Sequence, residues 1–230
     1  MCELFGMSSR FPADVNLSHS ELARHGGGTG PHRDGWGVAF HQQRDAWLIK
    51  EPASAATSEC ERFVEQHTFR STLVLSHIRL ATRGAVGFEN TQPFSRELGG
   101  RAHVAHNGDL PGLQAAHPLA RGRFRPLGDT DSEHAFCLLL ERLAPLWLPT
   151  SDVPPVARRR AVVEELAALL RPIGPANFLY ADGDAPFVHG HRRRQPGDEG
   201  YHPPGLHVLC RSCEQRPGEL VVCRSGRILD

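Results

Sequence analysis

The most constraining feature of this chain is its N-terminal sequence, Met-Cys-Glu-Leu-Phe-Gly, at residues 1–6. Cysteine is small enough for the preceding initiator methionine to be trimmed, so we expect Cys2 to carry a free α-amine. An α-amine titrates near pH ~8 and a thiol near ~8.5, so this amine can take the proton from the thiol of the same residue. The alternation of Leu4 with Glu3 and Phe5 predicts the start of a strand, which would hold the terminus in place.

The composition favours an ordinary globular protein. Hydrophobic residues make up 40% of the 230-residue chain, and 26 basic residues balance 26 acidic ones, which argues against nucleic-acid or anionic-membrane binding. No apolar run approaches the ~20 residues of a membrane span, and no signal sequence is apparent. We therefore expect a single cytoplasmic domain over residues 1–230, with its six cysteines as thiols.

Local patterns predict a mixture of strands and helices. Ser/Thr-x-x-Glu capping boxes at 18–21, 58–61 and 130–133 predict three helix starts, and a glycine run at 26–30 ends the first helix. A further helix is expected over 154–170, between prolines, and 90–94 is expected to be irregular. Strands are predicted at 34–40, 46–50, 72–79, 102–106, 178–180, 186–188, 206–209 and 220–222, with a turn at 225–226.

Four polar positions follow predicted strands or begin a helix: Cys2, Arg79, Asn107-Gly108 and Asp131. Acyl transfer from an amide needs a nucleophile, a base, an oxyanion hole and substrate anchors. Cys2 and its amine would supply the first two. The side-chain amide of Asn107 and the backbone N–H of Gly108 would form the oxyanion hole.

The two charged positions complete the prediction. Arg79 has a bidentate fork suited to a carboxylate, and Asp131 is an anion suited to an ammonium group. Beside a thiol, this pair describes a pocket for a free α-amino acid. If the attacked carbonyl is a side-chain amide, that amino acid is glutamine.

The chain resembles class II glutamine amidotransferase domains, the N-terminal-nucleophile hydrolases that begin with cysteine after methionine removal. The resemblance covers roughly residues 1–140, and the ordered set of motifs is specific although each motif alone is weak. The matching pieces are Cys-Glu-Leu-Phe-Gly at 2–6, Asp-Gly-Trp-Gly at 34–37, His-Ile-Arg-Leu-Ala-Thr at 77–82, His-Asn-Gly at 106–108 and Thr-Asp-Ser-Glu at 130–133.

The resemblance implies an α+β fold, the four-layer αββα sandwich of two stacked antiparallel sheets. It also implies that Cys2 is the nucleophile, that Asn107 and Gly108 form the oxyanion hole, and that Arg79 and Asp131 bind the substrate carboxylate and amine. Three further residues of the matching motifs, Thr82, His106 and Trp36, are candidates for substrate binding. Considered individually, His106 also fits a supporting role and Trp36 a core position.

The likeness is greatest to small stand-alone members of the family, through the Gly-Gly-Gly-Thr-Gly-Pro-His-x-Asp-Gly-Trp-Gly stretch at 26–37. We find no synthase domain that would use ammonia. The sequence between the last predicted strands is short for the family, so one of the two sheets is expected to be incomplete. We expect an amide hydrolase that cleaves glutamine or a related γ-glutamyl amide through a Cys2 thioester. Neither a cofactor nor a metal is expected, and a separate synthase subunit could accept the ammonia.

Each motif also fits a structural role, and two other functions stay open. Arg79 alone fits a salt bridge, Asn107-Gly108 a hairpin turn, and Asp131 a helix start. The chain could be a catalytically silent binding or regulatory subunit on the same fold, which retention of Met1 would favour. A zinc site is the other alternative, because Cys210 and Cys213 have metal-ligand spacing.

Overall fold

The computed structural model describes residues 2–106, 109–119, 122–194, 200–203, 206–214 and 222–229, without the side chains of 17, 102–106, 210–214 and 222–229. Two four-stranded antiparallel sheets form its centre. The first has the order β1 (Glu3–Ala13), β4 (Ser71–Ile78), β2 (Trp36–Gln42) and β3 (Asp45–Glu51). The second has the order β5 (Phe94–Leu98), β6 (Arg101–His106), β7 (Phe178–Ala181) and β8 (Pro186–His189).

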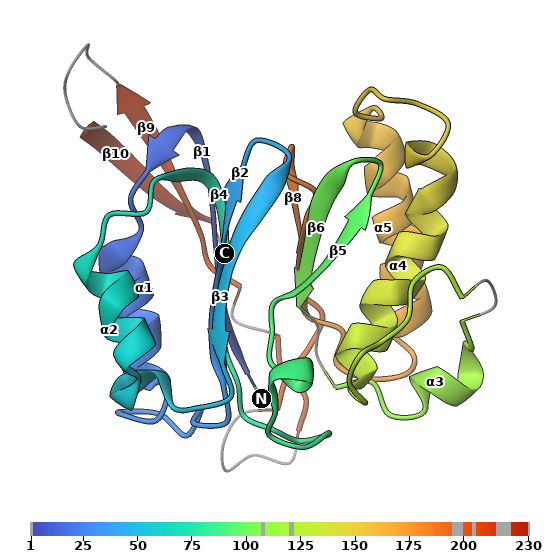
Figure 1. Ribbon diagram of the computed structural model, residues 1–230, viewed down its shortest axis with the longest axis horizontal. Coiled ribbons are helices and arrows are strands. Elements are labelled where there is room, and N and C mark those ends of the chain that lie inside the picture. Colours follow the sequence, from blue (N-terminus) through green and yellow to red (C-terminus); the bar gives the residue numbers. More distant parts are fainter. Residues whose placement is uncertain are drawn as a thin grey trace.

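Helices cover the outer faces of both sheets (Figure 1). The first sheet carries α1 (Asn16–His25) and α2 (Glu59–Gln66), and the short helix η1 (Ala55–Thr57) contacts both. The second sheet carries α4 (Asp131–Trp147) and α5 (Val156–Leu170), with the short helix α3 (Leu113–Ala116) beside α4. A further turn of helix, η2 (Phe88–Asn90), precedes β5. The arrangement is the αββα sandwich that the family resemblance implied.

Three apolar layers hold the sandwich together, one between each pair of adjacent layers. Strand β2 shows how the pattern works, because its side chains alternate between them. Trp36, Val38 and Phe40 pack toward α1 and α2, whereas Ala39 faces the second sheet. Small residues on the inner face bring the sheets close: a Cβ added to Gly6 of β1 would lie 3.2 Å from Cδ1 of Leu179 on β7.

The predicted burial of the strand at 72–79 is confirmed. Every residue of β4 except Thr72 is buried, on both faces of the sheet. This strand is central in the first sheet, where it pairs with β1 on one side and with β2 on the other. A largely apolar sequence is typical of a strand in this position, and the polar residues Ser76 and His77 are buried with it, since neither face meets water.

Two of the three predicted capping boxes are confirmed at the helix start. The hydroxyls of Ser58 and Thr130 accept hydrogen bonds from the backbone N–H groups of Glu61 and Glu133. The third prediction, at residues 18–21, is wrong, because α1 begins at Asn16, whose backbone N–H donates to the side chain of Asp14 at 2.7 Å. Asn16 is held by tertiary contacts as well: its side chain donates to the carbonyl oxygens of Glu65 and His67.

Two other local predictions differ from the structure. The irregular stretch predicted at 90–94 is wrong at both ends, because Asn90 belongs to η2 and Phe94 begins β5, whose polar centre gave no strand pattern. Pairing with β6 makes it a strand, with Arg96 opposite His103. The turn predicted at 225–226 is wrong, because both residues lie within β10 (Val222–Leu229), where the register shifts between Cys223 and Ser225.

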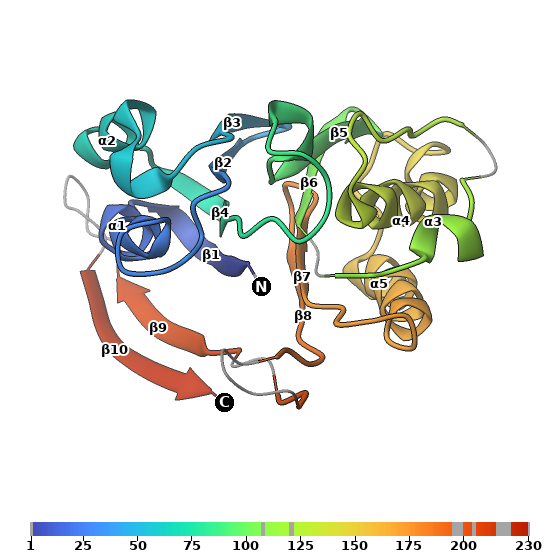
Figure 2. The ribbon, with the colours of Figure 1, turned by 90° about the horizontal axis from the view of Figure 1, so that it is seen from below.

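The C-terminal strands form a separate ribbon. Strand β9 (Val208–Glu214) pairs antiparallel with β10, and the ribbon lies on the side of the molecule near β1 and α1 (Figure 2). Both stacked sheets therefore have four strands without it. In the described part of the chain, no helix has the length and apolar character to cross a bilayer.

The contact between the two sheets generates a stability prediction. Leu75 is 2% exposed and packs in the inter-sheet layer with Leu179. We expect Leu75→Ala to lower the free energy of unfolding by about 2–5 kcal/mol, through lost burial and the cavity left behind. Urea unfolding measures this. Leu127→Ala is the matched control, because Leu127 is 78% exposed and the same truncation should change little there.

Candidate functional site

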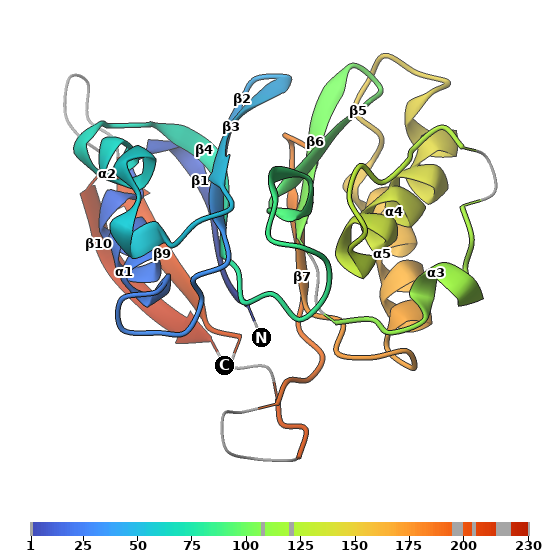
Figure 3. The same ribbon diagram turned by 60° about the horizontal axis from the view of Figure 1, so that its bottom comes forward.

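The candidate nucleophile, Cys2, precedes β1 at the lower end of the sandwich. Figures 2 and 3 show this end of β1 between the two sheets. Along β1, Leu4 packs in the inter-sheet layer while Phe5 packs toward the helices. Cys2 shares the alternation of Leu4, which places it on the inner side of the sheet. Its Sγ lies 3.6 Å from the carbonyl oxygen of Leu80, just beyond the end of β4.

The candidate carboxylate anchor, Arg79, follows the last residue of β4 and is 2% exposed. Its guanidinium donates to the carbonyl oxygens of Ala85, at 3.1 Å, and Arg83, at 2.9 Å. Within the described residues, no carboxylate lies within ion-pair distance of Arg79. A buried cation is costly unless it is paired, so this guanidinium is suited to a bound anion.

The surroundings of Cys2 keep its thiol protonated at rest. Burial raises the pKa of the Cys2 thiol above its ordinary value, and the negative charge of Asp34 acts in the same direction. The hydrogen bond to Leu80 and the positive charge of Arg79 oppose this rise in pKa without overcoming it. Attack by this sulfur therefore requires a base that removes the proton.

The segment after β4 is fixed by the loop that precedes β2. The carboxylate of Asp34 accepts a hydrogen bond from the backbone N–H of Ala81 at 2.8 Å. The backbone N–H of Asp34 donates to the carbonyl oxygen of Arg79 at 3.0 Å, and the N–H of Arg79 donates to Gly35 at 2.7 Å. These three bonds attach the backbone of Arg79 and Ala81 to the loop at Asp34 and Gly35. Thr82 is the next residue of this segment and is exposed.

The candidate amine anchor, Asp131, is the first residue of α4 and is 6% exposed. Its Oδ2 accepts from the backbone N–H of Leu110 at 2.5 Å. Burial raises the pKa of the Asp131 carboxyl, and Asp109 adds to the rise, whereas the hydrogen bond from Leu110 and the charge of Arg83 oppose it. A bound ammonium group would favour the ionised form of this carboxylate.

Contacts across the site join the Arg79 segment to the start of α4. The Nε of Arg83 lies 3.1 Å from Oδ1 of Asp109 and 3.9 Å from Oδ2 of Asp131. Gly84, at φ +71°, lies against the residues just before the helix, since an added Cβ would meet Asp129 at 2.6 Å. The two predicted substrate anchors therefore belong to segments that pack on each other.

A buried amide fixes the same junction. Asn90 is 2% exposed, and its Nδ2 donates to the carbonyl oxygen of Ala85 at 3.2 Å. Its Oδ1 accepts from the backbone N–H of Asp129 at 3.0 Å. The side chain of Glu133 holds the preceding turn by accepting from the N–H groups of Leu127 and Gly128.

The predicted oxyanion hole, Asn107 and Gly108, lies outside the described residues. The flanking chain is described: the backbone of His106 pairs with Leu179 at the end of β6, and Asp109 contacts Arg83. The side chain of His106 also lies outside the described part.

The structure does not bring Trp36 to the site. Its side chain is 1% exposed and packs in the layer between the first sheet and its helices, on the opposite face from Cys2. The indole Nε1 donates to a carboxylate oxygen of Glu51 at 3.2 Å. These contacts make Trp36 a core residue.

Sequence reasoning did not assign roles to Asp34, Arg83 and Asn90. Asp34 lies within a matching motif, which could have drawn attention to it. Arg83 is in the polar segment after a buried strand, where binding residues are common. Asn90 carries no such signal, because its importance comes from two backbone partners, Ala85 and Asp129, that only the fold brings together.

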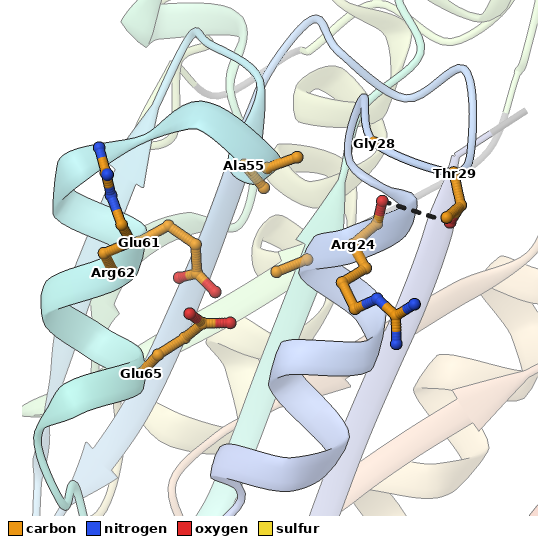
Figure 4. A pocket seen from close by; sticks show the side chains of 9 residues that line it. Arg24, Gly28, Thr29, Ala55, Glu61, Arg62 and Glu65 are labelled. Carbon is orange, nitrogen blue, oxygen red and sulfur yellow. Dashed lines mark hydrogen bonds between the residues drawn. The ribbon is translucent and has the colours of Figure 1, made fainter.

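A pocket of about 210 Å³ lies elsewhere, between α1 and α2 (Figure 4). Glu61 and Glu65 extend into this space from α2, opposite Arg24 of α1 and the loop that carries Gly28. The pocket is in the helix layer, on the outer side of the first sheet. It is therefore separate from the inner face on which Cys2 lies.

The alternative zinc site falls on side chains outside the described part. The backbone places Cys210 and Cys213 on β9, with Cys223 of β10 opposite Cys213. Among the described residues, no group of three or more histidine, cysteine and acidic side chains is arranged to hold a metal ion.

Comparison with known proteins identifies the family. A model of the class II glutamine amidotransferases matches residues 1–217, and the chain belongs to this family. It is 43% identical over 187 residues to the protein named "Putative glutamine amidotransferase YafJ" of Escherichia coli K12, covering 80% of this chain and 70% of that protein. A "Putative glutamine amidotransferase" of Haemophilus influenzae is 34% identical over 191 residues, which span 82% of this chain and 63% of its own length.

Solved structures agree with the fold. The structure titled as a predicted glutamine amidotransferase from Pseudomonas aeruginosa is 33% identical, with a TM-score of 0.59 over 89% of this chain and 85% of that one. The glutamine phosphoribosylpyrophosphate amidotransferase of Bacillus subtilis is 16% identical, with a TM-score of 0.52 over 82% of this chain and 36% of that one, and shares the fold.

The junction at Asn90 can be tested by removing its amide. We expect Asn90→Ala to lower the free energy of unfolding by about 1–3 kcal/mol, because two buried backbone groups lose their partner. Chemical unfolding measures this change. Gln114→Ala is the control, since the amide of Gln114 also reaches Asp129 but from an exposed position, where a loss below about 0.5 kcal/mol is expected. Equal effects of the two variants would contradict the role of Asn90.

Proposed function

We propose that this chain is an amide hydrolase that cleaves glutamine, or a related γ-glutamyl amide, through a thioester on Cys2. The observation that carries the proposal is the buried guanidinium of Arg79, which has no carboxylate partner among the described residues and lies beside the segment that contacts Cys2. A thiol next to an anchor for a carboxylate fits an amino-acid substrate. Membership of the amidotransferase family makes glutamine the first candidate.

In this proposal the α-amine of Cys2, freed by removal of Met1, acts as the base. It takes the thiol proton, and the thiolate attacks the side-chain amide carbon of the substrate. The negative oxygen of the tetrahedral intermediate is stabilised by Asn107 and Gly108. The α-ammonium then returns its proton to the departing nitrogen, which leaves as ammonia and gives the thioester.

Water completes the reaction by attacking the thioester carbon, which releases glutamate and restores the thiol. During both steps the α-carboxylate of the substrate stays bound to the guanidinium of Arg79, and Asp131 holds the α-ammonium group of the substrate. Thr82, three residues after Arg79, and His106, next to Asn107, are further candidates for substrate contact. The raised pKa of the Cys2 thiol supports a mechanism in which a dedicated base is needed.

The ammonia has two proposed fates: release into solvent by a single-domain hydrolase, or transfer to a separate synthase subunit. A panel of γ-glutamyl amides, with mass spectrometry of the products and of the acyl-enzyme, would identify the substrate. Purification of the full chain with its native partners would then show whether turnover depends on a second subunit.

The nucleophile is tested by substitution. We expect Cys2→Ala to abolish glutamine hydrolysis, measured as glutamate release, because no thioester can form. Circular dichroism and the unfolding midpoint should stay close to those of the unmodified protein. Cys60→Ala is the matched control, since Cys60 lies on α2 in the outer helix layer, and its activity should be unchanged. Retained activity in Cys2→Ala would refute the mechanism.

Intact mass measurement tests the base and separates the enzyme from a silent subunit. The proposal requires a mature protein that lacks Met1, because an α-nitrogen within a peptide bond cannot accept the thiol proton. A protein that retains Met1 and releases no glutamate would instead support a regulatory or binding role.

The carboxylate anchor is tested through substrate affinity. We expect Arg79→Lys to raise the KM for glutamine about tenfold or more, because an ammonium group cannot reproduce the bidentate contact, with a smaller change in kcat. Steady-state kinetics measures both constants. An unchanged KM would exclude Arg79 from substrate binding.

A further inference from the structure

A carboxylate and two histidines lie together on the outer side of Glu3, the residue that follows the proposed nucleophile. The carboxylate of Glu3 has one oxygen 2.8 Å from Nδ1 of His25 and the other 3.7 Å from Nδ1 of His32. His25 is the last residue of α1, and His32 lies in the loop between α1 and β2. The side chain of His32 is 6% exposed, whereas those of Glu3 and His25 are 31% and 48% exposed, so water is excluded only from the His32 side of the cluster.

The loop that carries His32 also holds the Arg79 segment. Two residues beyond His32, Asp34 binds the backbone of Arg79 and Ala81. One short stretch of chain, residues 32–34, is therefore attached at one end to the neighbour of the nucleophile and at the other to the predicted carboxylate anchor. The start of the same loop is fixed separately, because the carbonyl oxygen of Gly26 accepts from Ser54 and Ala56.

The residue before β1 needs such an attachment. Cys2 precedes the first residue of β1, and the ladder to β4 begins with Glu3 opposite Ile78. Terminal residues fray unless something beyond the ladder holds them. The carboxylate of Glu3 supplies that contact on the outer face, while the sulfur of Cys2 points to Leu80 on the other side.

We propose that Glu3 is a positioning residue, whose carboxylate is held by His25 and His32 so that Cys2 stays aligned with Arg79. Glu3 faces away from the substrate and acts only through the backbone of its neighbour. This assignment rests on the proposed hydrolysis of a γ-glutamyl amide. It also has a purely structural consequence, a slower opening of the first strand, which can be measured without substrate.

The test substitutes the carboxylate with the isosteric amide, Glu3→Gln, in the full chain. We expect kcat for glutamine to fall roughly fivefold while KM stays within about twofold, because the anchors for the substrate are intact and only the alignment of Cys2 is lost. Glu21→Gln is the matched control. Glu21 pairs with Arg24 on the same helix, with both side chains about 60% exposed, and its loss should change neither constant.

Hydrogen–deuterium exchange provides the readout that does not depend on activity. In Glu3→Gln, the amides of residues 3–8 should exchange several-fold faster, whereas those of α4 should exchange as before. The double variant Glu3→Gln with His25→Gln should be no worse than Glu3→Gln alone, because both substitutions remove the same contact.

The outcomes separate this inference from the proposed function. If the unmodified protein hydrolyses no γ-glutamyl amide, the proposed function fails, and the exchange data alone decide whether Glu3 holds the strand. Unchanged exchange and unchanged kcat in Glu3→Gln would overturn the positioning role. Faster exchange throughout the chain, with a lower unfolding midpoint, would also overturn it by showing a general loss of stability.

Discussion

The candidate site depends on the antiparallel pairing of β1 with β4. Its regular part runs from Glu3 opposite Ile78 to Ser8 opposite Leu73. The pairing of Glu3 with Ile78 decides which residues meet just beyond that end of the ladder. Because the two strands run in opposite directions, the beginning of one lies beside the end of the other. The proposed nucleophile, Cys2, which precedes β1, is thereby placed next to Arg79 and Leu80, although 77 or more residues separate them in sequence. A slip of one residue would turn Cys2 toward the helix layer and remove it from the inner face.

How much of the fold could be predicted from sequence depends on whether the contacts that fix each element are local. The capping boxes at Ser58 and Thr130 succeed because the cap and its N–H partner lie within one turn of helix. The start of α1 could not be predicted in this way, since Asn16 is held by the carbonyl oxygens of Glu65 and His67, about 50 residues away. Strand β5 is a different case, because its partner β6 follows after the two-residue turn Gly99-Gly100, and this glycine pair was a local signal for the hairpin. Local chemistry predicts local structure, and tertiary contacts decide the rest.

For the site, sequence motifs identified charged residues but not the contacts that hold them. Arg79 and Asp131 were predicted as anchors, and the structure describes both as buried, on segments joined by Arg83 and Asn90. Trp36 belonged to a matching motif as well, yet the two-residue period of β2 turns it to the helix side with Val38 and Phe40. The period of the strand was visible in the sequence. Which of its faces would meet the second sheet was not, because that depends on how the two sheets stack.

The proposal that Arg79 binds an anion is supported by its difference from a second buried arginine in the chain. Arg159 is equally buried, at 2% exposed, and its guanidinium pairs with Asp182 at 2.6 Å and Asp184 at 2.5 Å. Two carboxylates offset its burial, as expected for a structural arginine. Arg79 has only backbone carbonyls around it in the described structure, which satisfy N–H donors but leave the charge uncompensated. Because burial of an uncompensated charge is unfavourable, a carboxylate from outside the chain would gain most from binding at Arg79, and nothing comparable is offered at Arg159.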